Sequence, residues 1–153
     1  MSGKKNVEVK AKIVRLLIDA LGMEVNAILQ YQSFALNAKL GDYRSEKVAE
    51  LFNELATDET GDLKKFSEWL SNLGATIKTG LPVDILVTDD ATKMLQHAIH
   101  LEKTGIRKYK EIIEAIKEDP DSIEFDSYGL FHLVNHIIID EEEHLRKISR
   151  LLP

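Results

Sequence analysis

Apolar residues recur along most of the chain at the three- and four-residue spacing of a helix that buries one face. They follow this spacing from Ile13 to Ala38 in the first stretch and from Leu51 to Leu70 in the second. Gly41, Gly74 and the segment around residue 120 interrupt the pattern. The pattern therefore predicts four helices, over about residues 7–40, 42–73, 88–117 and 126–152.

The lengths of these helices and of their connections predict the topology. A helix of 30 residues is about 45 Å long, which suits a long antiparallel bundle. Two connections are short and can only reverse the chain, whereas residues 74–87 reach about 45 Å when extended. The sequence predicts an all-α four-helix bundle with one long crossover between helices two and three. It forms a single domain over residues 1–153, in which we expect residues 1–6 to be a mobile leader.

Composition narrows the classes of function. The 153 residues are 44% hydrophobic and 30% charged, as in a globular domain, and no cysteine is present for disulfides, thiolate metal sites or cysteine nucleophiles. The net charge of -6 makes nucleic acid an unlikely partner. Neither an apolar run of membrane-spanning length nor a signal peptide is found, so we expect no membrane association and a cytoplasmic location.

The chain contains an internal repeat. Residues 58–67 align with residues 140–149, with Asp, Glu, Leu, Lys and Ser in register. The first and third helices repeat a Glu, an Ile and a Tyr at identical offsets. These residues are Glu24, Ile28 and Tyr31 in the first, and Glu102, Ile106 and Tyr109 in the third.

The repeat places one glutamate near the middle of each helix. A single glutamate on a long helix usually faces solvent, but the shared spacing and register favour one buried acidic layer. Burying four carboxylates together is prohibitive unless cations compensate them. His144 follows its glutamate by three residues and shares its helix face, and Asp62 has the equivalent place in the other half. The sequence thus predicts a site for two metal ions; its four glutamates are Glu24, Glu59, Glu102 and Glu141.

These motifs resemble those of bacterioferritin and its ferritin-like di-iron carboxylate relatives over nearly the whole chain. The most specific segments are residues 24–31, 58–59, 101–102 and 140–144. The resemblance implies a ferritin-like bundle in which Glu59 and Glu141 bridge two metals. It further implies that Glu24 and Asp62 complete one metal position, that Glu102 and His144 complete the other, and that Tyr31 lies close to the pair.

Three departures from the family pattern change what the resemblance implies. Asp62 stands where the family has a histidine, which gives five carboxylates and one imidazole and favours hard, oxygen-loving ions. Thr60 stands where the haem-binding methionine would be, so no haem is expected. The chain ends nine residues after His144, without the family's short fifth helix. We therefore expect a homo-oligomer that is a dimer or a 12-subunit shell rather than the usual cage.

The resemblance implies a di-iron ferroxidase that oxidises Fe(II) with dioxygen or hydrogen peroxide, for iron storage or protection against oxidative stress. Two iron ions are the expected metals, with manganese as the alternative, and Tyr31 is the candidate catalytic residue beside them. A manganese catalase or another di-metal oxidase is an alternative function. A non-catalytic helical assembly protein with a degenerate metal site is a second alternative, which the aspartate at position 62 keeps open.

Overall fold

Four long helices carry the amphipathic stretches of the sequence. A computed structural model describes residues 2–38, 43–78 and 80–153, and within them no strand is present, so the all-α prediction is confirmed. None of the described helices has both the length and the apolar character needed to cross a membrane. The elements are α1 (Ser2–Ala38), α2 (Tyr43–Asn72), α3 (Ala91–Glu118), the short 3₁₀ helix η1 (Pro120–Asp126) and α4 (Ser127–Leu151).

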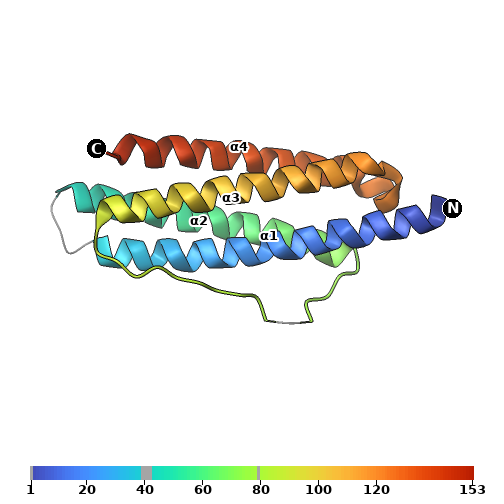
Figure 1. The fold of residues 1–153 in the computed structure, drawn as a ribbon, viewed down its shortest axis with the longest axis horizontal. Coiled ribbons are helices and arrows are strands. Elements are labelled where there is room, and N and C mark those ends of the chain that lie inside the picture. Colours follow the sequence, from blue (N-terminus) through green and yellow to red (C-terminus); the bar gives the residue numbers. More distant parts are fainter. Residues whose placement is uncertain (1, 39–42, 79) are drawn as a thin grey trace.

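The connection between α2 and α3 determines how the helices are arranged. It runs along α1 from one end of the bundle to the other, so α3 starts near the C-terminal end of α1 and runs parallel to α2 (Figure 1). The pairs α1–α2 and α3–α4 are antiparallel, and α1 also packs against α3 while α4 packs against α2. The four-helix bundle with one long crossover between α2 and α3 is therefore confirmed.

The start of α3 differs from the prediction because local capping outweighs helical periodicity. The helix begins at Ala91 and not at Thr88. The side chain of Asp90 accepts a hydrogen bond from the backbone N–H of Lys93 at 3.1 Å, which satisfies one free donor of the first turn. The hydroxyl of Thr88 in turn accepts from the Asp90 N–H at 3.1 Å, so residue 88 belongs to the capping turn.

The other helix ends also differ slightly from the prediction. α1 begins at Ser2, before the predicted start at Val7, and its first turns are exposed. The predicted boundary at residues 40–42 lies outside the described residues. Gly74, the predicted stop of α2, has a φ of 72°, a left-handed conformation that glycine adopts without strain and that ends helices.

The buried apolar side chains of the described residues form two clusters. One cluster fills the end of the bundle that contains Ile13, Phe66 and Ile137, and the other fills the end that contains Phe34 and Phe52. On each helix, one of the predicted glutamates lies between residues of the first cluster and residues of the second. The acidic layer therefore crosses the whole bundle, with a packed apolar core on each side of it.

Amide side chains of α1 hold the crossover in place. Gln30 is fully buried, donates to the carbonyl oxygen of Leu86 at 2.8 Å and accepts from its N–H at 2.7 Å. The side-chain oxygen of Asn26 accepts from the N–H of Asp84 at 2.7 Å. Because these bonds use backbone groups that no helix or strand satisfies, they fix the path of the crossover over α1.

Candidate metal centre

Every metal ligand expected from the sequence lies in the acidic layer. α1 contributes one residue, α3 contributes one, and α2 and α4 contribute two each, three residues apart on one face. All six side chains are buried, with exposed fractions between 1% and 4%. They are Glu24, Glu59, Asp62, Glu102, Glu141 and His144.

The six residues form two overlapping groups of possible metal ligands. In each group, one donor atom from every residue lies within 4.8 Å of the others. Glu59 and Glu141 belong to both groups, as residues that bridge two ions must. The remaining members are Glu24 and Asp62 in one group, and Glu102 and His144 in the other.

The imidazole of His144 is oriented from outside the layer. Its Nε2 lies 3.1 Å from Oδ2 of Asp58, and its Nδ1 faces inward, 3.2 Å from Glu59 Oε1 and 3.5 Å from Glu102 Oε2. A carboxylate that accepts from the outer N–H holds the ring in the tautomer whose inner nitrogen can bind a metal. Asp58 therefore orients the ring of His144, whereas Asp140, its counterpart in the repeat, lies 3.7 Å from His136.

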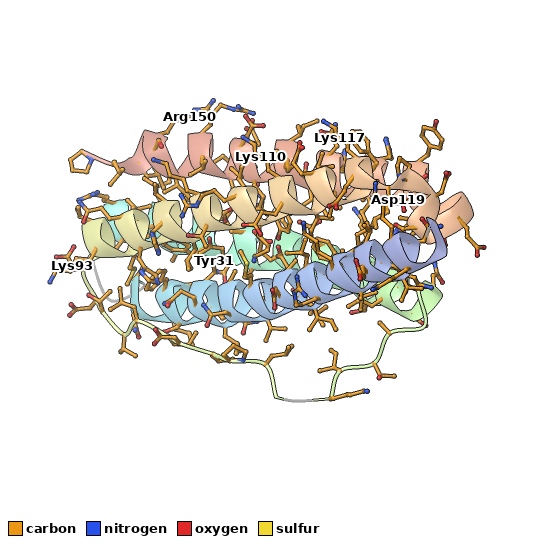
Figure 2. All side chains as sticks on the ribbon, turned by 45° about the vertical axis from the view of Figure 1, so that its right-hand side comes forward. Tyr31, Lys93, Lys110, Lys117, Asp119 and Arg150 are labelled. Atoms are coloured by element: carbon orange, nitrogen blue, oxygen red, sulfur yellow. The ribbon has the colours of Figure 1, made fainter. Side chains whose placement is uncertain are left out.

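Tyr31 lies beside the acidic layer, as expected. Its hydroxyl donates to Glu102 Oε1 at 2.6 Å, and its ring stacks on Phe52 with 5.4 Å between the centroids. Figure 2 shows Tyr31 inside the bundle, while Lys110, Lys117 and Arg150 lie on its outside. Burial, and then the neighbouring Glu102 carboxylate, raise the pKa of Tyr31 well above its ordinary value, so the hydroxyl stays protonated.

The layer contains polar atoms that no protein group satisfies. Among the described residues, eight buried side-chain nitrogen or oxygen atoms have no hydrogen-bond partner, and six of these belong to the layer. They include both carboxylate oxygens of Glu59 and Nδ1 of His144, whose ion-pair contacts do not have hydrogen-bond alignment. Each such atom costs about 1–3 kcal/mol. Five oxygens and one nitrogen that converge without partners are a donor set that fits a pair of divalent ions.

The pKa values of several residues in the layer are shifted in the direction that reduces its negative charge. Burial raises the pKa of Glu24 and of Glu141 well above the ordinary value, and the neighbouring carboxylates raise both further. Burial and the charge of Glu59 raise the pKa of Asp62 to about 7. For His144, burial favours the neutral ring, but the nearby Glu102 and Glu59 carboxylates outweigh it and raise the pKa to about 11. In the metal-free protein, bound protons therefore offset part of the negative charge of the layer.

Two openings connect the layer to the surface. One is a cavity of about 560 Å³ between α1, α3 and the crossover, with mostly apolar walls. The other, of about 370 Å³ between α2 and α4, is lined by Asp58, Asp62, Asp140 and Glu143 together with two lysines. The sequence predicted the six residues of the layer, but it predicted neither of the openings nor the hydrogen bonds of the α1 amides. A polar stripe at residues 26, 30 and 37 of α1, all hydrogen-bonded to the crossover, was the available signal for the amides.

We expect the metal-free protein to become less stable as the pH rises from about 5 to about 8. The folded chain keeps protons on Glu24, Glu141 and Asp62 above the pH at which the unfolded chain releases them. His144 also keeps its proton up to about pH 11, against 6.5 in the unfolded chain. Because the folded state binds more protons, its free energy of unfolding falls with pH. Urea unfolding in the presence of a chelator measures this slope; a flat or rising profile would contradict the described electrostatics. Glu24→Gln should make the slope shallower.

Comparisons with known proteins agree with this geometry. A sequence model of the ferritin-like domain matches residues 14–153. The bacterioferritin of Desulfovibrio desulfuricans is 26% identical over 144 residues, which cover 89% of this chain and 72% of that protein. A solved structure of that bacterioferritin, with a diiron site in different catalytic states, has a TM-score of 0.82 at 23% identity and covers 95% of this chain and 81% of its own. A ferritin-like diiron-carboxylate protein of Bacillus anthracis has a TM-score of 0.80 at 23% identity, covering 95% and 98%. The chain thus belongs to the ferritin-like domain family.

Proposed function

We propose that the protein is a ferroxidase, which binds two Fe(II) ions in the acidic layer and oxidises them with dioxygen or hydrogen peroxide. The observation that carries this proposal is the pair of overlapping donor groups that share Glu59 and Glu141. The likeness to a bacterioferritin whose structure contains a diiron site supports iron over manganese, the alternative occupant of the same donors.

The reaction is balanced with two iron ions. Each Fe(II) loses one electron; two electrons and two protons convert hydrogen peroxide to two waters, or dioxygen to hydrogen peroxide. Two adjacent ions therefore supply both electrons at once. The protein would hold the two ions side by side, and the electric field of its buried carboxylates would stabilise Fe(III) over Fe(II).

Asp62 strengthens that field. The layer has five carboxylates, which carry five negative charges when ionised, against four positive charges on two Fe(II) ions and six on two Fe(III) ions. A histidine at position 62 would leave one negative charge fewer. Because Fe(III) gains more from each buried negative charge than Fe(II) does, the aspartate stabilises the oxidised pair.

Asp58 and Tyr31 each hold one of the proposed metal ligands in position. Asp58 fixes His144 with Nδ1 facing inward. The protonated hydroxyl of Tyr31 donates to Oε1 of Glu102, while Oε2 of the same carboxylate has no hydrogen-bond partner. Tyr31 is therefore the candidate catalytic residue in the sense that it touches a ligand at the reaction site and carries a proton there.

The biological outcome of this activity would be iron storage or removal of peroxide in the cytoplasm. Storage requires an enclosed volume, which a homo-oligomer such as a 12-subunit shell provides and a dimer does not. Oxidation without storage requires only the site within one chain. Both outcomes use the same six ligands.

Replacing a shared glutamate should abolish paired oxidation. We expect Glu59→Gln and Glu141→Gln to lower the rate of aerobic or peroxide-driven Fe(II) oxidation by at least about 100-fold. Each substitution removes a carboxylate that belongs to both proposed metal positions, so it weakens both of them. Stopped-flow absorbance of Fe(III) measures the rate, and circular dichroism verifies that the helices remain. Glu142→Gln, at the exposed neighbouring position, is the matched control and should oxidise Fe(II) like the wild type. Wild-type rates in both glutamine variants would refute the ferroxidase proposal.

The role of Asp62 is tested by metal stoichiometry. We expect wild-type protein to bind two Co(II) ions per chain, and Asp62→Asn to lose at least about tenfold in affinity at one of them, because a neutral amide replaces a charged ligand. Asp62→His should keep two ions, since imidazole is also a metal ligand. Calorimetric titration under anaerobic conditions gives both numbers. Two ions of unchanged affinity in Asp62→Asn would show that Asp62 is not a ligand.

A further inference from the structure

The cavity between α1, α3 and the crossover is larger than oxidation of Fe(II) by dioxygen or peroxide requires. Its volume of about 560 Å³ lies in the range of pockets that hold small organic ligands. It reaches all four glutamates of the acidic layer, so a molecule inside it lies against the metal positions. Its apolar walls include Ile18, Met23, Leu81, Pro82, Leu101 and Tyr109.

Small residues on the facing helices create this space. Gly22 and Ala27 of α1 and Gly105 of α3 all line the cavity. A Cβ atom on Gly105 would lie 3.6 Å from Glu141 Oε2 and 3.7 Å from Cε of Met23, which is ordinary contact. A Cβ on Gly22 would lie 3.7 Å from Cδ2 of Leu81 in the crossover. Larger side chains at these positions would therefore extend into the cavity.

The side of the cavity opposite the acidic layer, its roof, is held in place by hydrogen bonds within the protein. Residues 80–84 of the crossover form it, and the hydrogen bonds of Asn26 and Gln30 tie the segment to α1. Lys108, the cation at the rim, lies 3.7 Å from Asp19 and 3.6 Å from Glu111. Its charge is thus already balanced by protein carboxylates, and the cavity offers an anion no unpaired lysine.

The cavity breaks the symmetry of the internal repeat. Both tyrosines of the repeat line the cavity, but Tyr31 donates to Glu102, whereas Tyr109 stacks on Phe66 with 5.6 Å between the ring centroids. Oε2 of Glu24, the counterpart of Glu102, is buried and has no hydrogen-bond partner. Oε2 of Glu102 also lacks a hydrogen-bond partner, so the floor of the cavity has buried polar atoms without hydrogen-bond partners, beside apolar walls.

We propose that this cavity binds a small uncharged organic molecule with a ring of phenol size, whose ring packs between Met23, Leu81 and Tyr109 and whose hydroxyl group faces Glu24. The apolar walls favour a ring over water, and an organic anion would lose its hydration against them without gaining an unpaired cation. A hydrated cation would lose its water against these walls, whereas the acidic opening between α2 and α4 suits it.

Phenol itself is the probe, and ligand-observed NMR of the full-length, metal-free protein at pH 6 measures its dissociation constant. We expect Gly105→Leu and Gly22→Leu to weaken phenol binding by at least about tenfold, because a leucine side chain occupies the space of the ring. Gly61→Leu is the matched control, since Gly61 lies on the other face of the bundle with open space around it. It should bind phenol like the wild type. Benzoate, a ring of similar size with a negative charge, should bind at least about tenfold more weakly than phenol.

Three results would overturn the proposal: no phenol binding by the wild type, equal binding by Gly22→Leu, or benzoate binding as tight as that of phenol. If Gly105→Leu does not fold, Gly22→Leu decides the outcome, because its Cβ faces the crossover and not a carboxylate. The assay contains no iron. Phenol binding without Fe(II) oxidation would therefore contradict only the ferroxidase proposal, and oxidation without phenol binding would contradict only this one.

Discussion

The fold is organised around five carboxylates that are buried in one layer of a helical bundle. Isolated negative charges in such a place would cost far more than the few kcal/mol by which a domain of this size is stable. Raised pKa values at Glu24, Asp62 and Glu141 show that the metal-free chain relieves this cost with protons. Metal ions at these donors would relieve it without protonation, so the proposed ion binding would be linked to folding.

The rest of the architecture follows from that layer. An apolar core on each side of it supplies stability that the layer itself does not, and it keeps the four helices in register. The crossover leaves α3 antiparallel to α1 (Figure 1), and the repeated glutamates of the four helices meet in the layer. The two hairpins are alike in sequence but not in surroundings: one opening of the layer is acidic and the other is apolar. Under the two proposals above, cations use the acidic opening and uncharged molecules use the apolar one.

Much of this could be predicted from the sequence, for identifiable physical reasons. Helical periodicity gave the helices, connection lengths gave the topology, and the register of the repeat gave Glu24, Glu59, Glu102 and Glu141. The position of Asp62 also followed, because a residue three places after Glu59 shares its helix face.

Other features depend on contacts between distant segments, which periodicity does not contain. The orientation of His144 results from Asp58, 86 residues away in sequence. The path of the crossover results from Gln30 and Asn26 on α1, and the apolar cavity results from glycines on different helices. Helix ends were also displaced, as at Ala91, where the side chain of Asp90 rather than the apolar pattern determines the first turn.

The central claim is that six side chains from four helices hold two metal ions in one layer. Anomalous diffraction from crystals grown anaerobically with Fe(II) tests it most directly. The account requires two peaks inside the bundle, both in contact with Glu59 and Glu141. One should also contact Glu24 and Asp62, and the other Glu102 and His144. Crystals with no anomalous peak in the layer, or with iron bound only at the outer surface, would contradict it.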